Sequence, residues 1–186
     1  MRKLIWMMSV SVDGFMEGPD HDISWHQVDE ELHSYLNDHL RGMGAFLSGR
    51  VTYELMAEFW PTADQDPDSP QPIVDFARIW RAMPKVVFST TLDHADWNTT
   101  VLPDIVPDDI RAMKTESGGD LLLGGANVGA TFLRHDLIDE IRVYVHPMVI
   151  GEGTRMFQAA DVKLQLQLAE THTFGNGVVL LRYERA

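Results

Sequence analysis

Two separated glycine turns carry the residue types that bind phosphate groups. One is Gly49-Arg50-Val51-Thr52 and the other is Gly124-Gly125-Ala126-Asn127, and each follows a short apolar run typical of a buried strand. Glycine lets the backbone approach a phosphate closely, and a helix after it offers unpaired N–H groups and the positive end of its dipole. Arg50 adds a guanidinium that can hold a phosphate through two hydrogen bonds, and Thr52 adds a hydroxyl. Taken alone, the second turn is equally consistent with tight packing of a helix on a strand.

A third candidate segment lies between these turns. Ser89-Thr90-Thr91 follows the apolar run 85–88 and supplies the hydroxyl and N–H donors that a ribose phosphate needs. Arg50 could instead be a solvated arginine at a helix start, but a cation is unfavourable there, which favours a binding role. The G-x-G-x-x-G fingerprint is absent from the sequence, so we do not expect a standard Rossmann domain.

The elements that must position these residues alternate along the chain. Residues 16–28 are expected to form a loop, and the proline-rich stretch 61–72 a surface excursion. The order of elements predicts an α/β fold with a mostly parallel, mixed sheet, helices on both faces and a C-terminal antiparallel hairpin. In such a sheet, ligands bind outside the carboxyl ends of the strands. Apolar runs predict strands at 4–12, 45–48, 85–88, 121–123 and 138–145. Apolar residues at helical spacing predict helices at 29–40, 52–58, 73–81 and 128–134. A glycine-rich turn predicts hairpin strands at 164–171 and 178–183.

Composition and charge restrict the classes of function. The chain has 186 residues, enough for one domain over residues 1–186. Its formal net charge of −13 disfavours nucleic acid and anionic membranes as partners, and no apolar run reaches the roughly 18–20 residues of a membrane helix. The chain has no cysteine and its eight histidines form no His-x-x-x-His pair, so we expect no metal site. The apolar run after Lys3 stops at Ser9 without a cleavage site, and we expect a cytoplasmic protein.

The ordered set of motifs resembles the dihydrofolate-reductase-like superfamily. It is most similar to the reductase domain at the C-terminal end of the riboflavin-biosynthesis deaminase-reductases and to stand-alone relatives of that domain. The resemblance covers nearly the whole chain and implies a three-layer α/β/α fold and a homodimer. The matching segments are Ser9–Gly14, Gly49–Glu54, Val86–Ser89, Leu122–Gly125, Leu137–Glu140 and Pro147–Thr154.

The resemblance implies that the chain binds NADPH through these same positions. Gly49, Arg50 and Thr52 would hold cofactor phosphates, and Ser89 and Thr90 would lie beside the adenosine ribose and its 2′-phosphate. The pyrophosphate would lie on the second turn, whose residues are Gly124, Gly125, Ala126 and Asn127. Backbone groups near Ser9 and Met16 would meet the nicotinamide carboxamide. A cis peptide between Gly124 and Gly125 is also implied.

A reductase of this kind needs a proton for the atom next to the carbon that accepts hydride. The family's carboxylate lies early in the first helix, which here begins Asp29-Glu30-Glu31. Glu31 is the favoured candidate because it shares a helix face with Tyr35, and Asp29 is the second. The alternative is an acidic N-cap cluster with no chemical role.

Four aromatic residues are candidates for the substrate pocket. Trp25 lies in the loop that would border the nicotinamide, Tyr35 lies on the first helix, and Tyr53 and Trp60 flank the second. For Trp25 the alternative is an anchor for a long loop, and for Tyr53 and Trp60 it is a place in the core.

These observations predict an NADPH-dependent reductase that transfers hydride to a planar heterocycle or to an imine or carbonyl carbon of a small molecule. One alternative is a stand-alone riboflavin-pathway reductase, which acts on 5-amino-6-ribosylaminouracil phosphate and should carry cationic residues for that phosphate. Another is a non-catalytic NADP(H)-binding sensor, which would keep the glycine turns and lack a proton donor.

Overall fold

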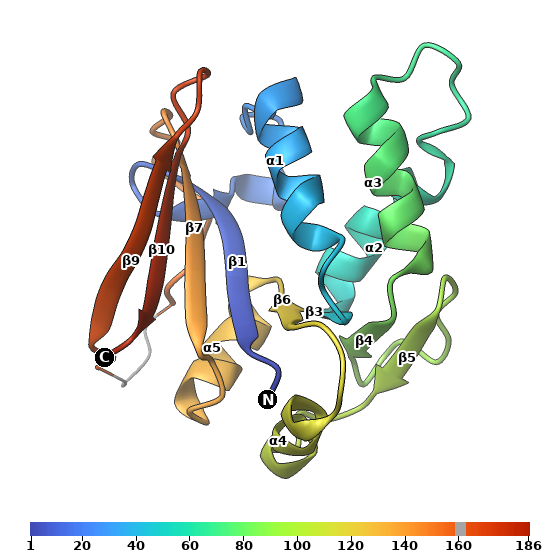
Figure 1. Cartoon of the computed structure of the whole chain (residues 1–186), viewed down its shortest axis with the longest axis vertical. Coiled ribbons are helices and arrows are strands. Elements are labelled where there is room, and N and C mark those ends of the chain that lie inside the picture. Colours follow the sequence, from blue (N-terminus) through green and yellow to red (C-terminus); the bar gives the residue numbers. More distant parts are fainter. Residues whose placement is uncertain (159–162) are drawn as a thin grey trace.

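The computed structural model describes residues 1–158 and 163–186 (Figure 1). One eight-stranded sheet runs through the molecule in the order β5-β4-β3-β6-β1-β7-β10-β9. Every neighbouring pair from β5 to β7 is parallel, whereas β10 is antiparallel to both β7 and β9. The strands are β1 (Leu4–Ser11), β3 (Ala45–Gly49), β4 (Lys85–Phe88), β5 (Thr99–Leu102), β6 (Leu121–Leu123), β7 (Glu140–His146), β9 (Leu166–Thr173) and β10 (Val179–Arg185).

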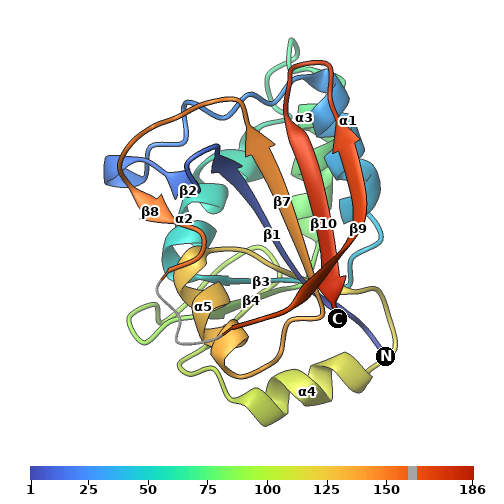
Figure 2. The same ribbon diagram turned by 90° about the vertical axis from the view of Figure 1, so that its left-hand side faces the viewer.

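Helices cover both faces of this sheet, which gives the expected three layers (Figures 1 and 2). The helices α1 (Glu30–Leu40), α2 (Arg50–Phe59) and α3 (Gln71–Ala82) pack on one face, and α4 (Pro107–Thr115) and α5 (Ala126–Arg134) pack on the other. Short 3-10 turns occur at Pro19–His21 and Trp60–Thr62, and β2 (Phe15–Glu17) pairs with β8 (Thr154–Arg155) in a small second sheet.

Alternation along the strands explains why the sheet is apolar on both faces. Within β6, Leu121 and Leu123 join the core under α4 and α5, while Leu122 points to the core under the other three helices. Trp6 of β1 is fully buried against α5. Its indole ring occupies the space that a side chain at position 129 would need, and Gly129 leaves that space free. Strands buried on both faces are typical of parallel sheets.

The predicted boundaries hold for most elements, with three differences. The helix after Gly49 begins at Arg50, two residues earlier than expected, because Gly49 itself is the N-cap. The segment 16–28, expected to be a loop, contains part of β2 and a 3-10 turn. The edge strand β5 was missed because its sequence, Thr99-Thr100-Val101-Leu102, has too few apolar residues to stand out from its polar surroundings.

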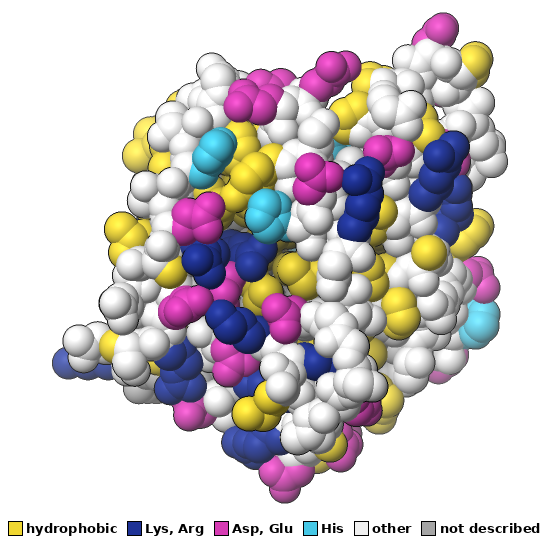
Figure 3. Space-filling model, in the orientation of Figure 1, with side chains coloured by type: hydrophobic (Ala, Val, Ile, Leu, Met, Phe, Trp, Pro, Cys, Tyr) yellow, Lys and Arg dark blue, Asp and Glu magenta, His cyan; other side chains and the backbone are white. Residues whose placement is uncertain are grey.

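Part of the sheet face beside α1 is covered by charged side chains instead of a helix. Figure 3 shows cationic and acidic side chains intermingled on this face. Glu140, which is buried, contacts Arg142 at 2.6 Å and both Lys3 and Arg182 at 3.3 Å. The positive and negative charges therefore pair locally, and this surface does not carry charges of a single sign. No helix in the described part of the chain is long and apolar enough to cross a membrane.

Candidate active site

The predicted phosphate-binding residues come together in one crevice at the carboxyl ends of β3, β4 and β6. One hollow, of about 260 Å³, is lined by Met16, Gly49, Arg50, Thr52, Gly125, Ala126 and Asn127, among others. A second hollow is lined by Ser89 and Thr90 and shares Arg50 and Asn127 with the first. We call these two hollows together the crevice.

Two helices begin at the wall of the crevice. Gly49 is the N-cap of α2 and Gly125 is the N-cap of α5, and neither helix start receives a hydrogen bond from a capping side chain. The first N–H groups of both helices are thus left for an anion. Gly125 has φ +95°, a conformation that favours glycine, and its N–H contacts the Met8 sulfur at 3.1 Å. The peptide between Gly124 and Gly125 is trans, so the expected cis bond is not present.

Charged side chains at the crevice are held by their neighbours. The Arg50 guanidinium contacts the Glu54 carboxylate at 2.7 Å, one turn along α2, and both side chains are nearly half exposed. Glu17, which is buried, contacts the His21 ring at 2.9 Å, and both side chains line the same hollow. An anion in the crevice would therefore compete with Glu54 for Arg50.

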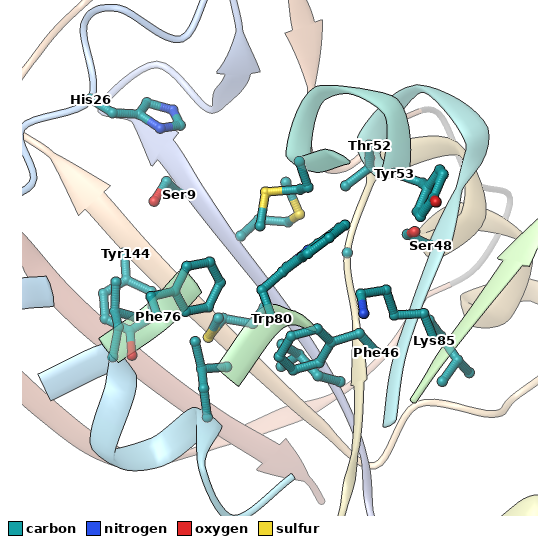
Figure 4. A pocket seen from close by; sticks show the side chains of 18 residues that line it. Ser9, His26, Phe46, Ser48, Thr52, Tyr53, Phe76, Trp80, Lys85 and Tyr144 are labelled. Carbon is teal, nitrogen blue, oxygen red and sulfur yellow. The ribbon is translucent and has the colours of Figure 1, made fainter. Parts of the chain in front are cut away.

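A second space, the apolar cavity, lies next to the crevice between the sheet and helices α1, α2 and α3. Its volume is about 240 Å³. Thr52 lines both spaces, and Gly124 lines the cavity while Gly125 lines the crevice. In Figure 4, Trp80 lies near the middle of the side chains that line the cavity. Phe46 and Lys85 lie to one side of Trp80, and Ser9 and His26 lie farther away on the other side. The apolar wall consists of Met7, Met8, Leu36, Leu40, Phe46, Leu47, Met56, Phe76, Trp80 and Leu122.

Three titratable side chains in the cavity wall have perturbed pKa values. Burial lowers the pKa of Lys85 to about 8, although its ammonium donates to the carbonyls of Met83 and Trp97 at 2.9 and 2.7 Å. Burial also lowers the pKa of His26, and burial raises the pKa of Tyr144. The Tyr144 hydroxyl is buried without a hydrogen-bond partner among the described residues. Perturbed groups in a cavity are typical of functional sites.

His26 belongs to an aromatic cluster that the sequence analysis did not identify. Its ring stacks on the ring of His146, with centroids 5.0 Å apart, and Trp25 meets both rings edge to face. His146 is fully buried, and its Nδ1 accepts a hydrogen bond from the Gln27 N–H at 3.0 Å. Burial, with His26 nearby, lowers the pKa of His146 to about 4. The cluster thus packs the loop before α1 against the end of β7.

Comparison with known proteins places this geometry in a family. Residues 2–180 match the RibD C-terminal domain. The chain belongs to this family. Two similar proteins of Bacillus subtilis (strain 168) are the uncharacterized protein YyaP, 30% identical over 183 residues (98% of this chain, 94% of YyaP), and the uncharacterized protein YwjB, 26% identical over 191 residues (100% and 99%).

Solved structures of other proteins share the fold of this RibD C-terminal domain. A riboflavin-biosynthesis-like protein from Shewanella sp. PV-4 has a TM-score of 0.74 at 18% identity, with 99% of each chain covered. The Thermotoga maritima deaminase/reductase has a TM-score of 0.68 at 14% identity, with 100% of this chain and 57% of that chain covered. Enterococcus faecalis dihydrofolate reductase, complexed with NADP(H), has a TM-score of 0.66 at 15% identity, with 98% and 96% covered. The expected dihydrofolate-reductase-like fold is confirmed.

The candidate acids of this RibD C-terminal domain lie outside the apolar cavity. The Asp29 carboxylate accepts the Leu32 N–H at 2.9 Å as the N-cap of α1, and the Glu31 carboxylate accepts the Gly175 N–H at 2.9 Å from the β9–β10 turn. Neither is among the residues that line the cavity. The face of α1 toward the cavity carries Leu36 and Leu40 instead. Both carboxylates thus bind backbone N–H groups, Asp29 as the N-cap of α1 and Glu31 at the β9–β10 turn.

Of the four aromatic candidates, one lines the cavity and three do not. Tyr53 lines the cavity, and its hydroxyl donates to the Asp96 carbonyl at 3.0 Å. Trp60 packs on Phe76 behind the cavity wall, with ring centroids 4.4 Å apart. Tyr35 stacks on His172 of the hairpin, and Trp25 packs on the histidine pair, so neither lines the cavity.

Proposed function

We propose that this RibD C-terminal domain is an NADPH-dependent reductase that holds the cofactor in the crevice and the substrate in the apolar cavity. The observation that carries the proposal is the junction of the two spaces at Thr52. A molecule that extends along the crevice from Ser89 and Thr90 past Arg50 reaches the cavity at this point. A dinucleotide has the required form, because its adenosine end and its central pyrophosphate can lie along the crevice while its nicotinamide ring reaches the cavity.

The crevice residues fit the anionic part of NADPH. The uncapped starts of α2 and α5 supply N–H groups, and Gly125 brings the backbone close to the crevice without a side chain. Arg50 supplies a guanidinium to a phosphate, and Ser89 and Thr90 supply hydroxyls to the 2′-phosphate. When bound, NADPH supplies the hydride, and the protein supplies its position and its surroundings.

The cavity residues would hold the acceptor against the cofactor and exclude water from it. Apolar side chains on three helices and the sheet cover it, and water exclusion strengthens the electrostatic interactions inside such a site. Among the described residues that line the cavity there is no carboxylate, and His26 is the histidine that lines it. We therefore propose His26, in place of Asp29 or Glu31, as the residue that exchanges a proton with the substrate or with water beside it.

The sensor alternative is favoured by one observation, the absence of a carboxylate from the described cavity wall. Titration of the full chain with NADPH and with NADH, followed by quenching of its five tryptophans, tests cofactor binding. Absorbance at 340 nm with a set of carbonyl and imine acceptors then tests turnover. Failure to bind NADPH at low salt would overturn both functions, and binding without turnover on any acceptor would favour the sensor.

A further inference from the structure

The lining of the apolar cavity restricts what the proposed reductase can accept. Apart from the polar atoms of a few side chains, the wall is aliphatic, aromatic or thioether in character. Trp80, Phe46 and Phe76 offer flat ring surfaces, against which a planar ring packs well. Met7, Met8 and Met56 are flexible and adjust to irregular shapes. A flat, apolar molecule therefore matches this wall.

The volume of the cavity matches the size of such a ring system. An apolar cavity of about 150 Å³ is enough to bind benzene. The cavity here is about 240 Å³, which is large enough for two fused rings. It meets the crevice at Thr52, which lines both spaces.

The charges of the wall argue against an anionic substrate. Lys85 is the one lysine or arginine among the described residues that line the cavity. Its ammonium already donates to the two carbonyls of Met83 and Trp97 and lies 4.2 Å from the centre of the Trp80 ring. Burial lowers its pKa to about 8, so that part of its population is neutral near physiological pH. A substrate phosphate inside this cavity would lack a free cationic partner, and such burial is costly.

We infer, resting on the proposed reductase function, that the apolar cavity binds a neutral, fused two-ring aromatic or heteroaromatic compound with a carbonyl or imine group. In the reaction the ring carbon of the C=O or C=N bond receives the hydride, and the oxygen or nitrogen receives a proton from water or from His26. The cofactor is oxidised and the double bond is reduced to an alcohol or an amine. A substrate phosphate of the riboflavin-pathway type would find no free lysine or arginine in the described wall of this cavity.

Two probes with the same ring test the charge requirement. The full chain is titrated by calorimetry at pH 7 with 2-naphthol, which is neutral, and with naphthalene-2-sulfonate, which is anionic. Because an unpaired buried charge costs several kcal/mol, we expect the neutral probe to bind at least ~10-fold more tightly. Equal or tighter binding of the sulfonate would overturn the inference.

Two tryptophan substitutions on α2 test the location. Met56 lines the cavity, whereas its neighbour Leu55 is 38% exposed and does not line it. We expect Met56→Trp to fill the space and weaken 2-naphthol binding at least ~10-fold, in line with the tight packing of protein interiors. The matched Leu55→Trp variant should bind 2-naphthol as the unmodified chain does. Unchanged binding to folded Met56→Trp would place the probe elsewhere and overturn the inference.

Titration with NADPH separates this inference from the proposed function. The crevice that holds the phosphates does not include Met56 or Leu55, so both variants should still bind NADPH, and Leu55→Trp with unchanged affinity. If the unmodified chain binds NADPH but not 2-naphthol, the inference fails and the reductase remains. If it does not bind NADPH, the proposed function itself fails. Should Met56→Trp not fold, the comparison of the two probes on the unmodified chain still decides the inference.

Discussion

Arg50 and Glu54 form an ion pair one turn apart on α2, with 2.7 Å between guanidinium nitrogen and carboxylate oxygen, at the wall of the crevice. The pair is solvent-exposed, and exposed pairs at this spacing stabilise a helix by only ~0.3–0.5 kcal/mol. A phosphate that enters the crevice would meet a guanidinium whose other contact is weak. We therefore expect the pair to affect ligand binding more than folding.

Substitution of Arg50 tests this relation. Hydrogen bonds to charged groups are worth ~1.5–3 kcal/mol, so we expect Arg50→Ala to weaken NADPH binding by ~10-fold or more, with the melting temperature of the free protein nearly unchanged. Glu54→Gln is the matched variant, and it should strengthen NADPH binding because it removes the competing carboxylate. Fluorescence titration and thermal unfolding measure both effects. A loss of several degrees with intact NADPH affinity would show that Arg50 has a structural role.

The two adjacent glycines should respond differently to alanine. Gly125 has φ +95°, and a Cβ there would lie 3.0 Å from the Thr52 hydroxyl oxygen. Strained backbone of this kind costs ~1–3 kcal/mol, so Gly125→Ala should lower the melting temperature and weaken NADPH binding. At Gly124 a Cβ would lie 3.7 Å from the nearest atom, a Thr52 methyl group, which is ordinary contact. Gly124→Ala should therefore be the milder change in thermal unfolding, and the reverse order would contradict this account of the turn.

The acids at the start of α1 should prove to stabilise the fold. Loss of an N-cap costs ~1 kcal/mol, so we expect Asp29→Ala to lower the free energy of unfolding by about that amount. Glu31→Gln weakens the hydrogen bond from the Gly175 N–H and should act in the same direction. Once an acceptor is known, both variants should keep its turnover within ~2-fold, because the structure places neither side chain in the cavity. A large loss of kcat in a folded variant would restore the carboxylate as a candidate acid.

His146 predicts a dependence of stability on pH. Its pKa in the fold is lowered to about 4 from its ordinary value of 6.5, so between these values the unfolded chain binds more protons than the folded chain. The free energy of unfolding should then fall as the pH drops through this window, by at most ~1.4 kcal/mol per pH unit from this group. His146→Phe should flatten that part of the profile in urea unfolding. His94→Gln, at a histidine that is 82% exposed, should leave the slope unchanged. An unchanged slope in His146→Phe would contradict the assignment.

The crevice could be predicted from the sequence because its determinants are local. Gly49 and Gly125 each follow an apolar run and precede a helix, and the sheet order then brings the two turns together. The cavity could not be predicted in this way, because its wall depends on how three helices pack on the sheet. Trp80 is an ordinary apolar position of a helix in the sequence, and Lys85 is the first residue of a strand.

The histidine cluster and the two acids illustrate the same limit. His26 and His146 are far apart in the sequence, and nothing in the local pattern of either indicates that their rings stack. For Glu31, helical spacing correctly grouped it with Tyr35, but that face turns toward the C-terminal hairpin and not toward the cavity. The position of the hairpin beside α1 is a tertiary feature that periodicity does not contain.

The place of Thr52 in the wall of both spaces has a kinetic consequence. If the crevice holds a dinucleotide, its ring end becomes part of the boundary of the apolar cavity at this residue. The bound cofactor would then add a wall to a cavity that the protein alone already forms. We therefore expect a preferred order of addition, in which a substrate analogue binds more tightly to the protein with NADP⁺ than without it.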